Sequence, residues 1–583
     1  MQQTRIVALT AVVAVLAAVP AADAATKKRR PLPATTSHAT IEGADPGAAY
    51  STLRAGPGWK RVVRSDFAPA ARGRSQKRSS LLYFGQLSDF QLADEESPVR
   101  VEALDLTSTP FTSAWRPQEA LGPQTIDQGI RQVGRFTRSP LRQRGGRYAK
   151  LALVVTTGDS ADNQQANEVR WTVSLLEGGR LDPNSGVDRA GCGAPGEAAR
   201  YTGVQDDDDV LDSGRFYDPD RPSGAYAAWP RYPGLMDRAQ QPFAAAGLPV
   251  PSYVAFGNHD GLVQGNAWAN AAFQGLAVGC VKPLQAGGLA ASALTTSPQN
   301  SLLVPPDPGR GLVGRKGYMA LHAGGRQADA HGFAHVDPAE AKASAGEASY
   351  YSFSPRKGVR LVSINTVAEG EVVGSEGNLD DPQFRWIERT LEASDKAGEL
   401  VILFGHHPLR SLSQPDPDEG ATPCDVRKTA GPGCDGDPRD SRPIRLRADL
   451  QRLLEDHRSV VAYVAGHTHE HKVTPFRRTD GSGFWGIETA SEVDWPINSR
   501  LLELMDNRDG TLSLFGTVLD HAAPVAAPAP GTAAAGMTEL QLASIARELS
   551  YNDPQAGGKN ATVGGTGKPH DRNVELLLRD PRP

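Results

Sequence analysis

The sequence, 583 residues long, predicts a layered α/β fold. Apolar runs of strand length recur along the chain, and the segments between them carry apolar residues at helical spacing. Alternation of this kind is typical of βαβ units, whose parallel strands form the central sheet. Several runs also end abruptly at a polar cluster. The length exceeds that of one ordinary core, which indicates one large domain with insertions or two domains.

In the first half, apolar runs predict strands at residues 81–88, 151–156 and 253–256. Each run is followed directly by a polar cluster. Between them, apolar residues recur at the three- and four-residue spacing of a helix face. These predicted helices are marked by Ile126, Ile130 and Val133, by Val169, Val173 and Leu176, and by residues 235–246.

In the second half, residues 350–353 and 359–364 are rich in β-forming side chains and predict a hairpin. Two further strands are expected at 400–404 and 460–464, each again followed by a polar cluster. The helices expected before them are marked by Phe384, Ile387 and Leu391, and by Leu446, Leu450, Leu453 and Leu454. Closing strands are expected at 483–489, 500–505 and 511–519.

The chain ends and boundaries have distinct compositions. Arg5, an apolar run over 6–19 and the small residues before Ala25 predict an export signal over 1–24, too short for the ~20 residues of a membrane span. No later run is long enough to span a membrane. After the signal we expect a mobile basic leader at 25–78 and a main domain at 79–521, which carries insertions at 178–233, 261–347 and 409–443. An Ala/Pro linker with a C-terminal extension is expected at 522–583.

Charge and cysteine content argue against a nucleic-acid-binding protein and against a cysteine zinc site. The net charge is −5 and the arginines are scattered, so the basic stripe of a nucleic-acid-binding protein is absent. The cysteines have no Cys-x-x-Cys spacing, which favours disulfides in an exported protein over zinc binding. We expect Cys424 to pair with Cys434 across a Gly/Pro-rich loop, and leave the connectivity of Cys192 and Cys280 open.

The polar clusters contain donors suited to metal ions. Loops after the strands of layered α/β proteins converge on one rim, so the clusters are expected to lie together. Mixed carboxylate, amide and imidazole donors without thiolates suit manganese, iron, zinc or magnesium, and the set is large enough for two ions. A single histidine is more often structural, but five clusters together favour a metal centre. The candidate ligands are Asp89, Gln91, Asp159, Asn258, His406, His467 and His469.

The order of the clusters resembles the motif order of the calcineurin-like metallophosphoesterase family. The matching segments are Asp89-Phe90-Gln91, Gly158-Asp159-Ser160-Ala161-Asp162, Gly257-Asn258-His259-Asp260, His406-His407-Pro408 and Gly466-His467-Thr468-His469. The resemblance covers roughly residues 80–520 outside the insertions, and residues 483–496 with the strands after them resemble an exported bacterial branch. It implies a four-layer αββα sandwich.

The resemblance also implies roles for these residues. Asp159 would bridge two divalent ions, with Asp89, Gln91 and His469 completing one site and Asn258, His406 and His467 the other. The implied reaction is hydrolysis of phosphate mono- or diesters by in-line attack of a metal-bridging hydroxide. His259 would act as an acid or stabilise charge. His407 is an alternative to His406, while Asp162, Asn163, Asp260 and Asp494 are expected to support the site.

Gln91 departs from the family pattern, which has histidine at that place. Its amide is neutral and a weaker ligand, which favours a harder ion, with manganese slightly preferred. The Asp-x-Gln sequence also resembles the manganese-dependent ADP-ribose and CDP-alcohol diphosphatase branch, so a nucleotide-diphosphate-type diphosphatase is an alternative. Another is a metal-binding cell-surface or structural protein on a decayed scaffold. Trp229, Tyr232 and Trp268 either stack on a substrate or form the core of the insertions.

Overall fold

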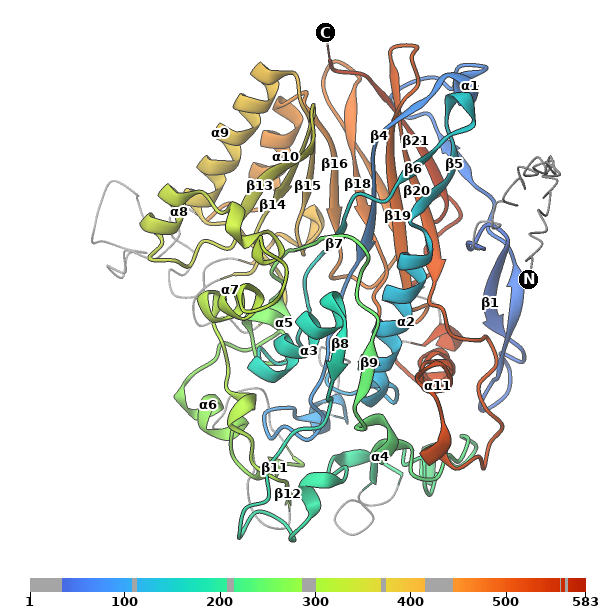
Figure 1. Cartoon of the computed structure of the whole chain (residues 1–583), viewed down its shortest axis with the longest axis vertical. Helices are drawn as coiled ribbons and strands as arrows, with labels where there is room; N and C mark the ends of the chain where they lie inside the picture. Colours follow the sequence, from blue (N-terminus) through green and yellow to red (C-terminus); the bar gives the residue numbers. More distant parts are fainter. Residues whose placement is uncertain are drawn as a thin grey trace, which may run out of the picture. The chain divides into compact units, whose positions relative to one another are not determined.

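Two mixed sheets, of seven and six strands, lie at the centre of the computed structural model (Figure 1). It describes residues 34–106, 113–206, 214–285, 300–368, 374–414, 444–555, 557–560 and 565–582. The larger sheet has the order β10-β7-β4-β19-β20-β21-β3. Its strands are β3 (Val62–Arg64), β4 (Ser79–Leu87), β7 (Val154–Thr156), β10 (Ser252–Val254), β19 (Asn498–Asp506), β20 (Thr511–Asp520) and β21 (Val574–Arg579).

Three neighbouring strands of the larger sheet run parallel: β10 pairs with β7, and β7 with β4. They are the strands predicted in the first half of the sequence. Because they are parallel, their carboxyl ends meet at one edge. The strands β19, β20 and β21 continue the sheet in antiparallel pairs, which confirms two of the predicted closing strands.

The smaller sheet has the order β13-β14-β15-β16-β18-β17. Its four central strands are parallel, and the edge strands β13 and β17 are antiparallel to their neighbours. The predicted hairpin is the β13–β14 pair. The strands are β13 (Tyr351–Arg356), β14 (Val359–Ser363), β15 (Leu400–Phe404), β16 (Val460–Ala465), β17 (Lys472–Arg477) and β18 (Gly483–Glu488).

The central strand β15 is buried on both faces, as its unbroken apolar sequence requires. Ile402 and Phe404 belong to an apolar cluster that also contains side chains of the larger sheet, such as Leu502. Val401 and Leu403 point the other way, into a cluster with side chains of the helices α9 (Asp381–Ala397) and α10 (Arg447–Asp456). The two sheets therefore share one core, and helices cover the opposite face of the smaller sheet.

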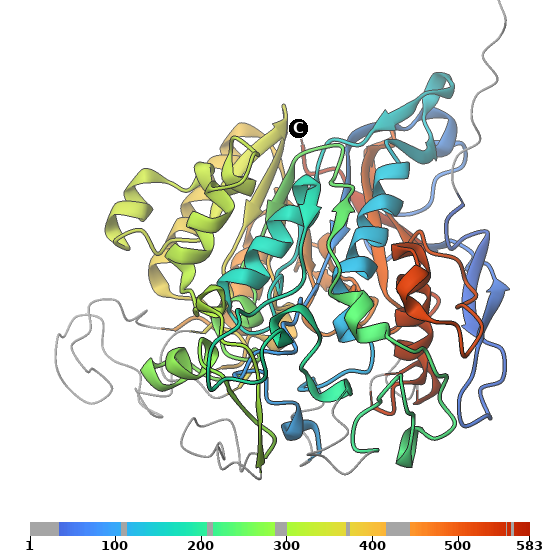
Figure 2. The same ribbon diagram turned by 60° about the horizontal axis from the view of Figure 1, so that its bottom comes forward.

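Helices lie against both sheets. α9 and α10 flank the smaller sheet, α2 packs on β19 and β20, and α11 lies beside α2 (Figure 2). Within the described ranges, no helix combines the length and apolarity needed to cross a membrane. The helices are α1 (Arg74–Lys77), α2 (Gly122–Arg135), α3 (Ala166–Glu177), α4 (Leu235–Ala239), α5 (Asn258–Gly261), α6 (Ala271–Ala277), α7 (Arg315–Ala323), α8 (Pro338–Ala343), α9 (Asp381–Ala397), α10 (Arg447–Asp456) and α11 (Glu539–Asn552).

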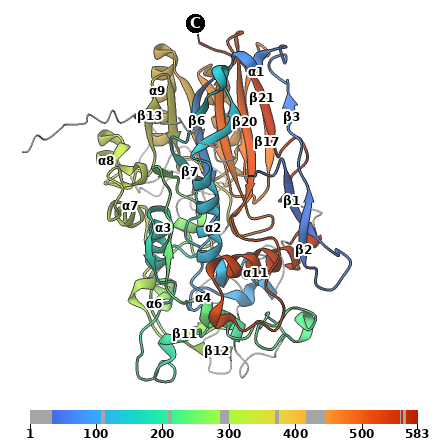
Figure 3. The ribbon, with the colours of Figure 1, turned by 45° about the vertical axis from the view of Figure 1, so that its right-hand side comes forward.

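Both ends of the described chain contribute to the larger sheet, which differs from the expected leader and C-terminal extension. β3 comes from the segment expected to be a mobile leader, and β21 from the expected extension; the two pair in parallel (Figure 3). Residues from 34 onward therefore belong to one contact unit with the main domain. Each strand has at most six residues and its partner is distant in sequence, so local periodicity does not reveal the pairing.

The insertions contain more regular structure than the sequence predicts. The expected helix at 235–246 ends at Ala239, and Phe243–Ala245 forms β9 instead, because Pro242 cannot continue a helix. The insertion at 261–347 carries α6, α7 and α8. The described residues also form four two-stranded sheets. These pair β1 (Ala39–Gly43) with β2 (Leu53–Pro57), β5 (Arg138–Arg142) with β6 (Tyr148–Lys150), β8 (Gly179–Leu181) with β9, and β11 (Val281–Pro283) with β12 (Ser301–Leu303).

A disulfide joins Cys192 to Cys280 and links two of the insertions. The predicted pair Cys424–Cys434 lies outside the described residues.

The Cys192–Cys280 bridge spans 88 residues of sequence, a long loop whose closure restricts the unfolded chain. We expect the Cys192→Ala/Cys280→Ala double variant to lose about 2–5 kcal/mol in the free energy of unfolding. Urea denaturation monitored by fluorescence measures it, with each single variant as a control; equal midpoints for wild type and double variant would contradict the expectation.

Two buried histidines are expected to make the stability of the fold sensitive to acid. His322 and His331 share an Nδ1 to Nδ1 contact of 3.1 Å. Burial, and for His322 also its neighbour His331, holds the pKa of both below the ordinary value, although Glu177 and Asp329 act in the opposite direction on His331. The unfolded state therefore binds more protons below about pH 6.5, and stability is lost as pH falls from there toward the lower folded-state pKa.

The substitution His331→Asn tests this expectation. Asparagine tolerates the left-handed backbone of His331, at φ 54°, and does not titrate. The loss of unfolding free energy between pH 7.5 and 5 should be smaller in the variant than in the wild type. Denaturant titrations at several pH values give this slope. Identical slopes would show that His331 does not contribute.

Candidate metal site

The five predicted polar clusters meet at the carboxyl ends of the parallel strands. A cavity of about 380 Å³ opens there and is lined by residues from four of the clusters. Asp89 and His406 lie at the same place but are fully buried. The predicted candidates lining the cavity are Gln91, Asp159, Asn258, His259, His467 and His469.

Five of the candidate ligands have a left-handed backbone. This conformation is uncommon for residues other than glycine and costs about 1–3 kcal/mol where the fold enforces it. Strain of this kind concentrates at functional sites, where it directs side chains toward a common point. The residues are Asp89 (φ 52°), Gln91 (φ 40°), Asp159 (φ 55°), His467 (φ 71°) and His469 (φ 51°).

Asp159 lies at the centre of the site. Its Oδ1 accepts a hydrogen bond from the backbone N–H of His259 (2.9 Å), and its Oδ2 lies 3.2 Å from His406 Nε2. Burial favours the neutral acid, but His406 and His259 outweigh it and hold the pKa of Asp159 well below its usual range. Ligand atoms of Asp89, Asp159 and His406 lie within 4.8 Å of one another, which is close enough to surround one cation.

The two adjacent histidines of the fourth cluster differ in what they can bind. His406 Nδ1 donates to the carbonyl of Thr157 (2.8 Å), which leaves the lone pair of Nε2 facing Asp159. His407 uses both ring nitrogens: Nε2 donates to the carbonyl of Ser375 (2.8 Å) and Nδ1 contacts the hydroxyl of Thr366 (2.8 Å). Although a ring nitrogen of His407 also lies near His406 and His467, its hydrogen bonds favour His406 as the ligand.

The third cluster is fixed by Asp260. Its carboxylate accepts hydrogen bonds from the backbone N–H groups of Gly257, Ser160 and Ala161, each at 2.9 Å, and so ties the second cluster to the third. The Nδ2 group of Asn258 donates to the carbonyl of Gly265 (3.0 Å), so its amide oxygen faces inward. Asp260 therefore has the supporting position that the sequence predicts.

His259 is buried beside the cavity. Its Nδ1 donates to the carbonyl of Asp162 (2.9 Å) and lies 3.3 Å from that residue's carboxylate. Asp162 is in turn paired with Arg100 (2.5 Å) and with the amide of Asn163 (2.9 Å). Since Nδ1 is occupied by these contacts, Nε2 is the ring nitrogen available to the cavity.

The fifth cluster approaches Asp89. The backbone N–H of His467 donates to Asp89 Oδ1 (2.9 Å), and His469 Nε2 lies 3.4 Å from the same oxygen. His469 Nδ1 contacts Asp494 Oδ2 at 2.5 Å. A carboxylate behind a histidine is the arrangement that fixes the ring orientation of metal ligands, so Asp494 also has the expected supporting position.

Gln91 does not have the geometry expected of a ligand. Its amide oxygen accepts a hydrogen bond from Arg116 Nη2 (2.7 Å), and its Nε2 donates to Asp159 Oδ2 (3.1 Å). Arg116, which was not identified from the sequence, also pairs with Asp494 (2.7 Å) and lines the cavity. No local motif marks Arg116, because it lies in an irregular segment between the first cluster and α2.

The donor set fits a metal ion at the position of Asp159. Within the described residues, the buried Oδ1 of Asn258 accepts no hydrogen bond, and the buried Nε2 of His406 faces only the carboxylate of Asp159, although such atoms are normally paired. Both belong to residues around Asp159, where a cation would complete their bonding. The oxygen and imidazole donors suit manganese, iron, zinc or magnesium.

The aromatic residues of the insertions do not line the cavity. Trp229 and Tyr232 are buried in an apolar cluster that includes Leu542 and Ile545 of α11, and so form core. Trp268 is 43% exposed and does not line the cavity. The structure thus favours a core role for the first two.

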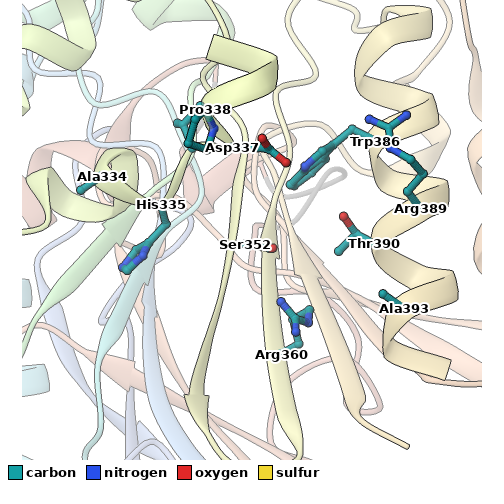
Figure 4. Close-up of a pocket in the computed structure, with 11 residues that line it drawn as sticks. Ala334, His335, Asp337, Pro338, Ser352, Arg360, Trp386, Arg389, Thr390 and Ala393 are labelled. Carbon is teal, nitrogen blue, oxygen red and sulfur yellow. The ribbon is translucent and has the colours of Figure 1, made fainter. Parts of the chain in front are cut away.

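A second cavity, of about 510 Å³, lies between α9 and the segment before α8 (Figure 4). Its arginines are paired with acids: Arg360 with Glu399 (2.7 Å) and Arg389 with Glu340 (2.6 Å). His335 stacks on Phe353, with ring centroids 5.3 Å apart. This cavity lacks the converging carboxylates and imidazoles of the first one.

Comparison with solved structures gives distant likenesses, among them a dimetal phosphatase and PhoD. No protein-family model matches the chain, and no curated protein matches it. A dimetal phosphatase from Danio rerio is 13% identical over 76% of this chain and 100% of its own, with a TM-score of 0.34. PhoD is 9% identical over 86% and 81%, with a TM-score of 0.29. At these values the likenesses do not establish the fold or activity of this chain.

Proposed function

We propose that this protein hydrolyses phosphate esters with two divalent metal ions bound around Asp159. The observation that carries the proposal is the convergence of buried carboxylates, buried imidazole nitrogens and the amide oxygen of Asn258 at the shared end of the parallel strands. We further propose that the two sheets and their helices are the four-layer αββα sandwich that the sequence resemblance implies.

Each ligand role in the proposal has a geometric basis. Asp159 lies between the other donors and would bridge both ions. Asp89 and His469 would bind one ion, and Asn258, His406 and His467 the other. This mixture of oxygen and imidazole donors suits manganese, which we take as the ion to test first. Divalent ions in such a pair polarise the phosphoryl group and lower the pKa of bound water.

In addition to the metal ions, the side chain of His259 would take part in catalysis. His259 is oriented by its contact with Asp162, so Nε2 can donate a proton to the leaving oxygen or stabilise charge on the phosphoryl group. The network that binds Nδ1 fixes the ring before substrate enters. Such prior orientation lowers the cost of reaching the transition state.

We propose that the protein is exported after cleavage near Ala24. The predicted signal at 1–24 lies outside the described residues. The Cys192–Cys280 disulfide supports the proposal, since disulfides persist in oxidising compartments. The substrate would then be an extracytoplasmic phosphate monoester or diester, with a nucleotide diphosphate as the alternative.

Hydrolysis of mono- and bis-p-nitrophenyl phosphate by the purified mature protein tests this function. Activity should disappear after chelation and return when Mn²⁺ is added. The ratio of the two rates distinguishes a monoesterase from a diesterase, and ADP-ribose tests the diphosphatase alternative. If Mn²⁺ binds but no compound is hydrolysed, a metal-binding surface protein becomes the better account.

A further inference from the structure

Arg116 is a buried cation within the cavity that the proposed metal ligands also line. Its side chain is 2% exposed, and its Nε and Nη2 groups bind Asp494 and Gln91, each at 2.7 Å. A third contact, from Nη1 to the carbonyl of Ser113, is 3.3 Å long. A guanidinium has five N–H groups in one plane, so these three bonds leave donors that can face a ligand in the cavity.

The orientation of the Gln91 amide is determined by Arg116 and Asp159; its Nε2 also lies 3.4 Å from Nε2 of His469. Arginine can only donate hydrogen bonds, and a carboxylate can only accept them. The oxygen of Gln91 must therefore face Arg116 and its NH₂ group must face Asp159. In the reversed orientation, the NH₂ group would face the N–H groups of Arg116 and the oxygen would face the carboxylate of Asp159. Both contacts are repulsive, so the amide oxygen of Gln91 is not free to bind a cation at Asp159.

We propose that Arg116 binds the phosphoryl group of the substrate, and that Gln91 is a positioning residue for Arg116 rather than a metal ligand. This inference rests on the proposed phosphoesterase function. A planar guanidinium matches two oxygens of a phosphate and is the side chain best suited to that task. Gln91 connects it to Asp159, and Asp494 connects it to His469, so the cation is fixed relative to both proposed ligands.

The proposal separates metal binding from phosphate binding. Gln91→Ala should retain the same number of Mn²⁺ ions per chain as the wild type, measured by elemental analysis after gel filtration. Arg116→Ala should also retain its metal, but should bind inorganic phosphate about 10- to 100-fold more weakly by calorimetry, as expected for loss of hydrogen bonds from a charged group. Its KM should rise by a similar factor.

Further variants keep the test independent of folding. Arg116→Lys preserves the charge beside Asp494 and should fall between wild type and Arg116→Ala. Added guanidinium should partly restore phosphate binding in Arg116→Ala, which a purely structural role would not allow. Arg389→Ala, which removes an arginine paired with Glu340 outside this cavity, should bind phosphate like the wild type.

Two results would overturn the proposal. Loss of one Mn²⁺ ion from Gln91→Ala would make Gln91 a ligand, as the sequence resemblance implies. Unchanged phosphate affinity in a folded Arg116→Ala would remove Arg116 from the binding site. Either result concerns a variant while the wild type still hydrolyses esters, so it refutes only the roles given to Arg116 and Gln91. Failure of the wild type to bind Mn²⁺ or to hydrolyse any ester would refute the proposed function as well.

Discussion

Replacing Asp159 with asparagine is expected to reduce phosphoester hydrolysis by about three powers of ten or more. Asp159 is the carboxylate around which the other donors are arranged, and its charge would balance two cations. Divalent ions stabilise the transition state by several kcal/mol, and each 1.36 kcal/mol corresponds to a factor of ten in rate. Asparagine has nearly the same shape, so the fold should survive the change.

The measurement combines turnover of bis-p-nitrophenyl phosphate with metal content. Asp159→Asn should lose both activity and bound Mn²⁺, while thermal unfolding confirms that it is folded. Asp337→Asn is the matched control, because Asp337 caps α8 by accepting from the N–H of Ala339 (2.8 Å) and lies outside this cavity. Full activity in Asp159→Asn would exclude Asp159 from the centre.

His259→Asn is expected to lower kcat by about 10²- to 10⁴-fold, the range for loss of a general acid or base. His259 is not among the proposed ligands, so metal content should remain at the wild-type value. His457→Gln is the control, since His457 Nδ1 also contacts a carboxylate, Asp395 (2.7 Å), but outside the cavity.

The leaving group distinguishes the two possible roles of His259. p-Nitrophenolate departs readily without a proton, whereas an alkoxide does not. If His259 is the acid, the defect of His259→Asn should be larger for an alkyl phosphate ester than for the p-nitrophenyl ester. Equal defects would indicate charge stabilisation instead, and a variant with wild-type kcat on both would remove His259 from catalysis.

The sequence predicts the central strands well because their signal is local. The strands β7 (Val154–Thr156) and β15 (Leu400–Phe404) are buried on both faces and therefore almost entirely apolar, and each ends where polar residues begin. Parallel pairing then brings those ends together. Convergence of the five clusters thus follows from features within a few residues of each strand.

Other features depend on partners far apart in the chain. β3 pairs with β21 across more than 500 residues, and Cys192 pairs with Cys280 rather than with a near neighbour. The most consequential case is Gln91, whose residue type is compatible with metal binding. Only its contact with Arg116 reveals that the amide oxygen already has a partner.

The proposed function depends on two divalent ions bound by Asp159 and its neighbours. The most direct test is a crystal structure of the Mn²⁺-loaded protein with anomalous diffraction at the manganese edge. We expect two anomalous peaks that share Asp159, with Asp89 and His469 at one and Asn258, His406 and His467 at the other. Absence of any peak within coordination distance of Asp159, in a protein that hydrolyses phosphate esters, would contradict it.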